Sequence, residues 1–350
     1  MTKFMEIATV IEIFDRRLEP VVAGVQALEH PCTGARWSEG PVWMHEDDSL
    51  LWSDIPNDRI LRWSERDGMS VWHEHVEFTN GHTRDHDGSL LHCSHGMRAV
   101  YRTRGDGPPE VLVDRFEGKR FNSPNDIVVK SDGTIWFTDP PYGIVIPEEG
   151  HPGVSELGDC FVFRFDPRTQ ALTKLTDLPE EPNGLAFSPD ESLLYVSDTS
   201  AALRIDASGN HCIWVFDMRH GRELAAGRVF AVVSPGLTDG FRLDHQGWSY
   251  TSSLDSLQIC HPNGDLLGKQ VSRAGKNRQR DIWRRGTRPA LHRRVDVDLS
   301  RPTRDARHPA AVGNLRTSGS FALSMSRGGG QQHGSQERTS SRTLWPTAAK

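Results

Sequence analysis

A short pattern of hydrophobic and polar residues recurs five times along the chain. In each copy a polar residue opens a short apolar stretch, a turn follows, and an apolar or aromatic stretch ends near Ser, Thr or Asp. The copies begin at Glu39, Asn80, Asn125, Asn183 and Asp239, between 41 and 58 residues apart. An irregular period of about 40 to 60 residues is typical of β-propeller blades, whose four strands are joined by loops of variable length.

The residues inside and after each copy favour strands and tight turns. Asp87-Gly88 and Asp132-Gly133 lie between strand-like stretches, where such pairs form hairpin turns. Further strand-like segments follow the copies, such as ILRWS from Ile60 and FVFRF from Phe161, and would supply the third and fourth strands. Because only five copies are visible, a sixth blade would have to come from the two chain ends.

The five residues that open the copies all carry oxygen in their side chains. Glu39, Asn80, Asn125, Asn183 and Asp239 occupy one phase of the repeat, so a propeller would gather them at one end of its central channel. A single Asn-Gly or Asp-Gly pair is more typical of a turn, but five copies in one phase favour a site. Oxygen ligands suit hard divalent cations, and a cation would offset the cost of burying these groups together.

Composition agrees with an all-β protein. Hydrophobic residues make up 36% of the chain, enough for a core, and 32 glycines with 21 prolines predict many turns. The five cysteines are scattered, so we expect no disulfide framework and a cytoplasmic location. No apolar run reaches the roughly 18 residues of a membrane span, and we expect no membrane partner.

Charge divides the chain into two parts. Residues 271–350 contain 17 Lys and Arg against 5 Asp and Glu, a net charge of +12. The preceding residues contain 24 and 42, a net charge of −18. The acidic part argues against nucleic acid as a partner and is compatible with a cation site.

Four segments carry a resemblance to a known family. They are SEGPVW at 38–43, NSPNDIVVKSDGTIWFTDPPYG at 122–143, PNGLAFSPDESLLYVSDT at 182–199 and TDGFRLDHQG at 238–247. Together they resemble the gluconolactonase/regucalcin family, also called the senescence-marker-protein family, from about residue 36 to about residue 269. The resemblance implies an all-β six-bladed β-propeller that opens sugar-acid lactones. Here its last blade is expected to be incomplete or aberrant.

The resemblance also implies which residues do the chemistry. One divalent metal ion, Ca²⁺ in first place with Mg²⁺, Zn²⁺ and Mn²⁺ as alternatives, would be held by Glu39, Asn183 and Asp239, with Asn125 in or near the shell. The metal would polarise the lactone carbonyl, and Asp239 would accept a proton from the attacking water. Asn80 and Asn125 are candidate substrate contacts.

Other residues near the expected channel mouth are weaker candidates. His82, two residues after Asn80, is predicted to contact the lactone. Tyr142 and His151 lie at a long loop between Pro140 and Leu157, which can cover the pocket, since loops of that length are often functional.

The C-terminal segment does not continue the pattern. We therefore divide the chain into an N-terminal arm at 1–30, the blades with the metal site at 31–269, and a basic tail at 270–350 that is expected to be disordered. A shifted reading frame near Gln270 explains the Arg-rich tail best, and a tail that binds an acidic partner is the alternative. An unclosed propeller exposes strand edges, which can compromise activity.

Two further functions remain compatible with these residues. One is a non-catalytic calcium-binding propeller. The other is a related ester or phosphotriester hydrolase, because the same metal can polarise other electrophiles.

Overall fold

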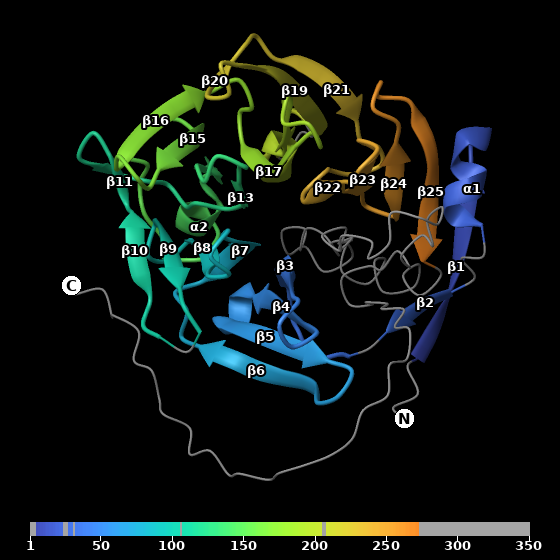
Figure 1. Cartoon of the computed structure of the whole chain (residues 1–350), viewed down its shortest axis with the longest axis horizontal. Helices are drawn as coiled ribbons and strands as arrows, with labels where there is room; N and C mark the ends of the chain where they lie inside the picture. The colour runs from blue at the N-terminus through green and yellow to red at the C-terminus, as the bar shows by residue number, and fades with distance from the viewer. Residues whose placement is uncertain (1–4, 24–26, 31, 106, 205–207, 273–350) are drawn as a thin grey trace.

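A computed structural model of the chain describes residues 5–23, 27–30, 32–105, 107–204 and 208–272. Almost every element is a strand, and the strands form antiparallel sheets that follow one another around a ring (Figure 1). The predicted all-β propeller is therefore confirmed. The predicted tail at 270–350 lies, from residue 273 onward, outside the described residues.

Three blades are four-stranded sheets, described here from the centre of the ring outward. The first contains β3 (Ser38–Met44), β4 (Ser49–Asp54), β5 (Arg59–Ser64) and β6 (Gly68–Glu74). The second contains β7 (Thr79–Arg84), β8 (Leu90–Ser94), β9 (Ala99–Thr103) and β10 (Glu110–Val113). The third contains β13 (Ile127–Val129), β14 (Ile135–Asp139), β15 (Phe161–Asp166) and β16 (Ala171–Thr176).

The fourth and fifth blades have additional strands. The fourth contains β17 (Pro182–Phe187), β18 (Leu193–Asp198), β19 (Cys212–Arg219), β20 (Glu223–Leu224) and β21 (Arg228–Val232). The fifth contains β22 (Phe241–Leu243), β23 (Ser249–Ser252), β24 (Ser256–Cys260), β25 (Leu266–Ser272), β1 (Met5–Ile13) and β2 (Ala27–His30).

The described residues form five blades, and the expectation of six is wrong for this part of the chain. The N-terminal strand β1 does not build a separate blade. Its Thr9–Ile13 segment pairs antiparallel with residues 268–272 of β25 and widens the fifth sheet instead. Strand β25 continues past residue 270 and ends at Ser272.

Several short elements lie between the blade strands. They are η1 (Arg16–Leu18), α1 (Glu19–Val22), η2 (Ile55–Asn57), the β11 (Arg115–Phe116) and β12 (Lys119–Arg120) hairpin, α2 (Tyr142–Val145) and η3 (Ser200–Leu203). None of the helices in the described ranges has the length and apolar character needed to cross a membrane. All five cysteines lie in these ranges as free thiols.

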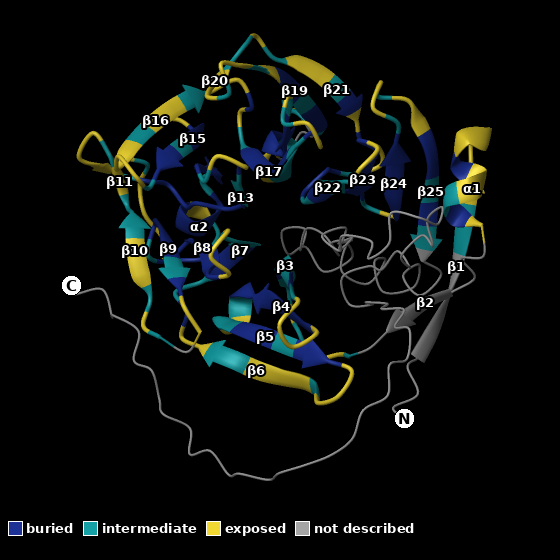
Figure 2. Ribbon diagram, viewed as in Figure 1, coloured by how far each residue is buried: buried dark blue, intermediate teal, exposed yellow. Residues whose placement is uncertain are grey.

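Burial follows distance from the centre of the ring (Figure 2). All five residues of β14 are buried, whereas β16, at the edge of the same sheet, is exposed or half-buried throughout. Apolar side chains fill the spaces between neighbouring sheets; Val100, Phe121, Phe137 and Phe163, for example, belong to one cluster shared by the second and third blades. The core is therefore divided among blade interfaces.

The N-terminal segment is anchored to the fifth blade by Leu18. Its side chain is 0% exposed and packs with Trp248, Tyr250, Leu257 and other apolar residues of that sheet. Leu18 thus covers one face of the sheet that β1 extends.

We predict that Leu18→Ala lowers the free energy of unfolding by about 2–5 kcal/mol, because it leaves a cavity in this cluster. Leu266→Ala is the matched control, since Leu266 belongs to the same blade but is 40% exposed. Urea unfolding followed by tryptophan fluorescence measures both. Equal losses in the two variants would show that Leu18 does not anchor the segment.

Candidate functional site

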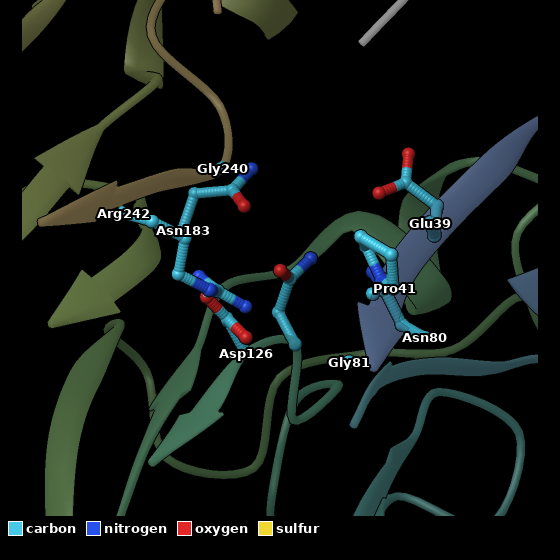
Figure 3. Close-up of a pocket in the computed structure, with 10 residues that line it drawn as sticks. Glu39, Pro41, Asn80, Gly81, Asp126, Asn183, Gly240 and Arg242 are labelled. Atoms are coloured by element: carbon cyan, nitrogen blue, oxygen red, sulfur yellow. The ribbon is translucent and has the colours of Figure 1, made fainter. Parts of the chain in front are cut away.

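The innermost strands begin around one small central pocket. It is lined by Glu39, Gly40, Pro41, Asn80, Gly81, Asn125, Asp126, Asn183, Gly240 and Arg242. In Figure 3, Glu39 and Asn80 lie on one side of the pocket, and Asn183 and Arg242 lie on the other. Four of the five residues predicted from the repeat therefore line the same pocket.

Buried aspartates at the ends of second strands hold the loops that lead into these residues. Asp54, Asp139 and Asp198 are each 0% exposed. Each carboxylate accepts hydrogen bonds from two consecutive backbone N–H groups: of Arg36 and Trp37, of Asn122 and Ser123, and of Glu180 and Glu181, at 2.8–3.3 Å. Glu39, Asn125 and Asn183 follow these loops within three residues. The aspartates therefore hold the backbone that leads into each site residue.

The backbone carbonyls of the site residues hold neighbouring blades together. A hydroxyl group near the end of one second strand donates to the site carbonyl of the next blade. The pairs are Ser53 with Asn80 at 2.9 Å, Thr138 with Asn183 at 2.6 Å and Ser197 with Asp239 at 2.8 Å. Because these carbonyls face the neighbouring blade, the side chains are left for the pocket.

The glycines that follow the site residues permit this close approach. A Cβ atom at Gly40 would lie 2.5 Å from the carbonyl oxygen of Asn80, and one at Gly184 would lie 2.5 Å from that of Asp239. At Gly81 a Cβ atom would collide with the carbonyl of Asn125 in the same way. Gly81 and Gly184 lie within strands, so these pairs are strand contacts between blades and not turns.

Three asparagine amides have neighbours at their nitrogen atoms. The Nδ2 atoms of Asn80 and Asn125 lie 3.2 Å and 3.4 Å from Nε2 of His95. Nδ2 of Asn183 donates to the Thr199 hydroxyl at 3.3 Å. With the nitrogen held in this way, the amide oxygen is the end that can serve a ligand in the pocket.

The two predicted carboxylates are buried. Glu39 is 1% exposed, and its Oε1 atom accepts a 2.6 Å hydrogen bond from the indole of Trp37. Asp239 is 3% exposed and directly precedes the pocket residue Gly240. Burial raises the pKa of Tyr142 well above its usual range, and the charges of Glu181 and Asp239 raise it further. The Asp239 carboxylate thus lies within electrostatic reach of Tyr142.

The loop after β14 reaches the site through Tyr142. Its hydroxyl contacts the Thr199 hydroxyl, and thereby connects α2 with the residue that holds Asn183. His151 instead lies farther along the loop, where its Nε2 atom is 2.9 Å from the Glu77 carboxylate.

The structure places His82 away from the pocket. Its Nε2 atom is 2.8 Å from the Ser53 hydroxyl, its Nδ1 atom is 2.6 Å from Nδ1 of His92, and the side chain is buried between blades. Burial lowers the pKa of His82 to about 3. This arrangement gives no support to the predicted contact with substrate, because Ser53 and His92 occupy both ring nitrogen atoms.

Sequence reasoning missed Asp126 and Arg242. Their side chains form a 3.5 Å ion pair at the pocket, and Asp126 also accepts from the backbone N–H groups of Ile127 and Leu185. Both residues lie one or three positions beyond a repeat opening, in Asn125-Asp126 and in Asp239-Gly-Phe-Arg242. Charged residues close behind a repeat opening were the available signal.

The donor chemistry of the pocket fits a hard divalent cation. Its wall carries the carboxylate of Glu39 and the amide residues Asn80, Asn125 and Asn183, and Asp239 directly precedes the lining residue Gly240. Carboxylate and amide oxygens are the ligand types that Ca²⁺ and Mg²⁺ prefer. The described residues contain no group of three or more His, Cys, Asp and Glu side chains arranged for a metal. A set with two carboxylates and several amides does not form such a group, so the candidate set is unaffected.

Comparisons with known proteins match the same part of the chain. A family model described as "SMP-30/Gluconolactonase/LRE-like region" matches residues 37–273. A gluconolactonase of Zymomonas mobilis is 33% identical over 73% of this chain and 75% of its own length. A pentonolactonase of Haloferax volcanii is 28% identical over 68% and 74%. A gluconolactonase structure from Xanthomonas campestris is 39% identical, with a TM-score of 0.72 over 77% of this chain and 88% of that one.

We predict that Gly81→Ala lowers the free energy of unfolding by about 1–3 kcal/mol, because its methyl group would push β7 away from the carbonyl of Asn125. Gly153→Ala is the control, since a Cβ atom there would have its nearest neighbour at 3.6 Å. Chemical unfolding of the two variants measures the difference. Equal midpoints would contradict the close contact between the blades.

Proposed function

The chain belongs to the SMP-30/gluconolactonase/LRE-like family, as its four motifs predicted, and we propose that it hydrolyses sugar-acid lactones with the help of one bound divalent cation. The observation that carries the proposal is the central pocket itself. Glu39, Asn125 and Asn183 reach its wall from three different blades, and Asp239 immediately precedes it in a fourth. Ca²⁺ is the first candidate, and Mg²⁺, Zn²⁺ and Mn²⁺ are alternatives.

The proposed ligands are Glu39, Asn183 and Asp239, with Asn125 in or beside the shell. When bound, the cation would polarise the lactone carbonyl and stabilise negative charge on its oxygen. Because the amides are neutral, they would leave more net positive charge at the pocket than a purely carboxylate set would.

Asp239 is the proposed general base. Its carboxylate would accept a proton from the water that attacks the lactone carbonyl, and the ring oxygen would leave with a proton as the ester bond breaks. The Tyr142 hydroxyl contacts Thr199, which in turn accepts from the amide of Asn183. Asn80 remains the proposed contact for substrate on the opposite side of the pocket.

The metal requirement has a direct test. Wild-type protein treated with a chelator and then dialysed should lose lactone turnover, and one of the four candidate cations should restore it. Turnover of D-glucono-1,5-lactone and of an aryl ester, followed by proton release, separates a lactonase from a broader ester hydrolase. Cation binding by calorimetry without turnover of either compound would instead indicate a non-catalytic calcium-binding propeller.

We predict that Asp239→Asn lowers lactone turnover about 10²- to 10⁴-fold, because an amide keeps an oxygen ligand but cannot accept the proton from water. Cation affinity should fall much less. Asp217→Asn is the control, since Asp217 is an exposed carboxylate on β19. Steady-state turnover at saturating cation measures the first effect, and calorimetry measures the second. Unchanged turnover in cation-loaded Asp239→Asn would remove Asp239 from the role of base.

A further inference from the structure

One position at the end of the second strand recurs in the blades that supply site residues. Strand pairing sets Ser38 opposite Asp54 and Pro182 opposite Asp198, one residue before Glu39 and Asn183 respectively. In the second blade, Thr79 lies opposite Ser94 in the same register. The residues that follow these partners are therefore equivalent: Ile55, His95 and Thr199.

The polarity of the residue at this position depends on whether the site residue of the same blade is an amide or a carboxylate. In the second and fourth blades it is polar, and it contacts the amide nitrogen of Asn80 or Asn183. In the first blade the site residue is the carboxylate Glu39, which has no amide to orient, and the equivalent position is the apolar Ile55. The match suggests that the position serves the amides.

We propose that His95 and Thr199 are positioning residues, which bind the nitrogen ends of Asn80, Asn125 and Asn183 and so turn the three amide oxygens toward the central pocket. The inference rests on the proposed function, because it explains how amide side chains become oxygen ligands for a cation.

Hydrogen bonding determines which ring nitrogen of His95 is the acceptor. Nδ1 lies 3.0 Å from the backbone carbonyl oxygen of Glu149, which can only accept, so Nδ1 carries the proton. In the neutral ring Nε2 then has a lone pair, and it accepts from both Asn80 and Asn125. Asn125 needs no partner from its own blade, where Pro140 follows the buried Asp139.

Packing prevents the His95 ring from changing this arrangement. The side chain is 0% exposed. It lies against Gly143, where a Cβ atom would come within 2.5 Å of the Cβ atom of His95. The ring is therefore enclosed by the loop that begins at α2, and its two nitrogen atoms keep their separate partners.

Thr199 performs the same task with a hydroxyl group. Its Oγ1 atom has one proton, which it donates to the carbonyl of Glu181 at 3.4 Å. It accepts from Nδ2 of Asn183 at 3.3 Å, and it also contacts the Tyr142 hydroxyl, where either oxygen can donate. A rotated Asn183 amide would set its carbonyl oxygen against an oxygen whose proton is already used, so the observed orientation is favoured.

The consequence concerns the affinity for cations. An amide coordinates a cation through its oxygen, whereas its NH₂ group is a hydrogen-bond donor and repels one. Partners that orient the ligands of a metal typically change its affinity 10- to 100-fold when they are removed. We therefore expect the loss of either positioning residue to weaken cation binding while the blades stay folded.

The test compares Thr199→Val with Thr199→Ser. Valine keeps the shape and removes the hydroxyl, and serine keeps the hydroxyl. Calorimetry with Ca²⁺ alone should show affinity about 10- to 100-fold weaker for Thr199→Val and near wild type for Thr199→Ser. Turnover of the valine variant should recover as Ca²⁺ is raised to saturation, which a misfolded pocket would not allow.

His95→Leu and His95→Gln form a second pair, since glutamine offers a carbonyl that can accept from the amides and leucine does not. The leucine variant should lose affinity, and glutamine should restore part of it. Ile55→Val, at the equivalent position of the first blade, should leave affinity unchanged.

Wild-type affinity for Ca²⁺ in both Thr199→Val and His95→Leu would overturn the positioning role and leave the proposed function intact. If the wild-type protein itself binds none of Ca²⁺, Mg²⁺, Mn²⁺ and Zn²⁺, the metal requirement of the proposed function fails, and the inference fails with it. If Thr199→Val does not fold, the two His95 variants decide the question alone.

Discussion

The central pocket depends on the close approach of neighbouring innermost strands. The carbonyl of a site residue in one blade lies against a glycine of the preceding blade and accepts a hydroxyl hydrogen bond from that blade, as Asp239 does from Ser197 beside Gly184. No side chain larger than hydrogen fits at this contact. The spacing between blades, and with it the width of the pocket, is thus set by backbone contacts that repeat around the ring.

In this arrangement the backbone and the side chains of the site residues have different roles. Carbonyls join the blades, buried aspartates such as Asp139 fix the preceding loops, and side chains of the same site residues remain for the pocket. Orientation then needs a further set of residues, because an amide can present either end. His95 and Thr199 supply it from the ends of second strands, where they do not compete for the pocket wall.

The repeat phase was enough to predict which residues the structure brings together, because equivalent positions in a propeller meet at one end of the channel. It assigned the two chain ends to a sixth blade, whereas β1 pairs with β25 and widens the fifth, because pairing between chain ends leaves no local pattern. It did not predict that the His82 ring would contact Ser53 and His92, because these contacts depend on the interface between blades. Asp126 and Arg242 were missed because they are 116 residues apart and meet only across the pocket.

The two proposed carboxylate ligands, Glu39 and Asp239, belong to the first and the last of the five blades. Contacts between inner strands run in sequence from β3 through β7, β13 and β17 to β22, with Glu39 in the first strand and Asp239 just before the last. Along this series, the inner strands β7, β13 and β17 lie between the strand of Glu39 and the strand that follows Asp239. Small displacements at each contact between strands therefore add up. A cation bound by both carboxylates would join the two ends of that series directly. Its binding would then depend on the spacing of all five blades, and each glycine contact between them would affect the affinity without touching the ligand.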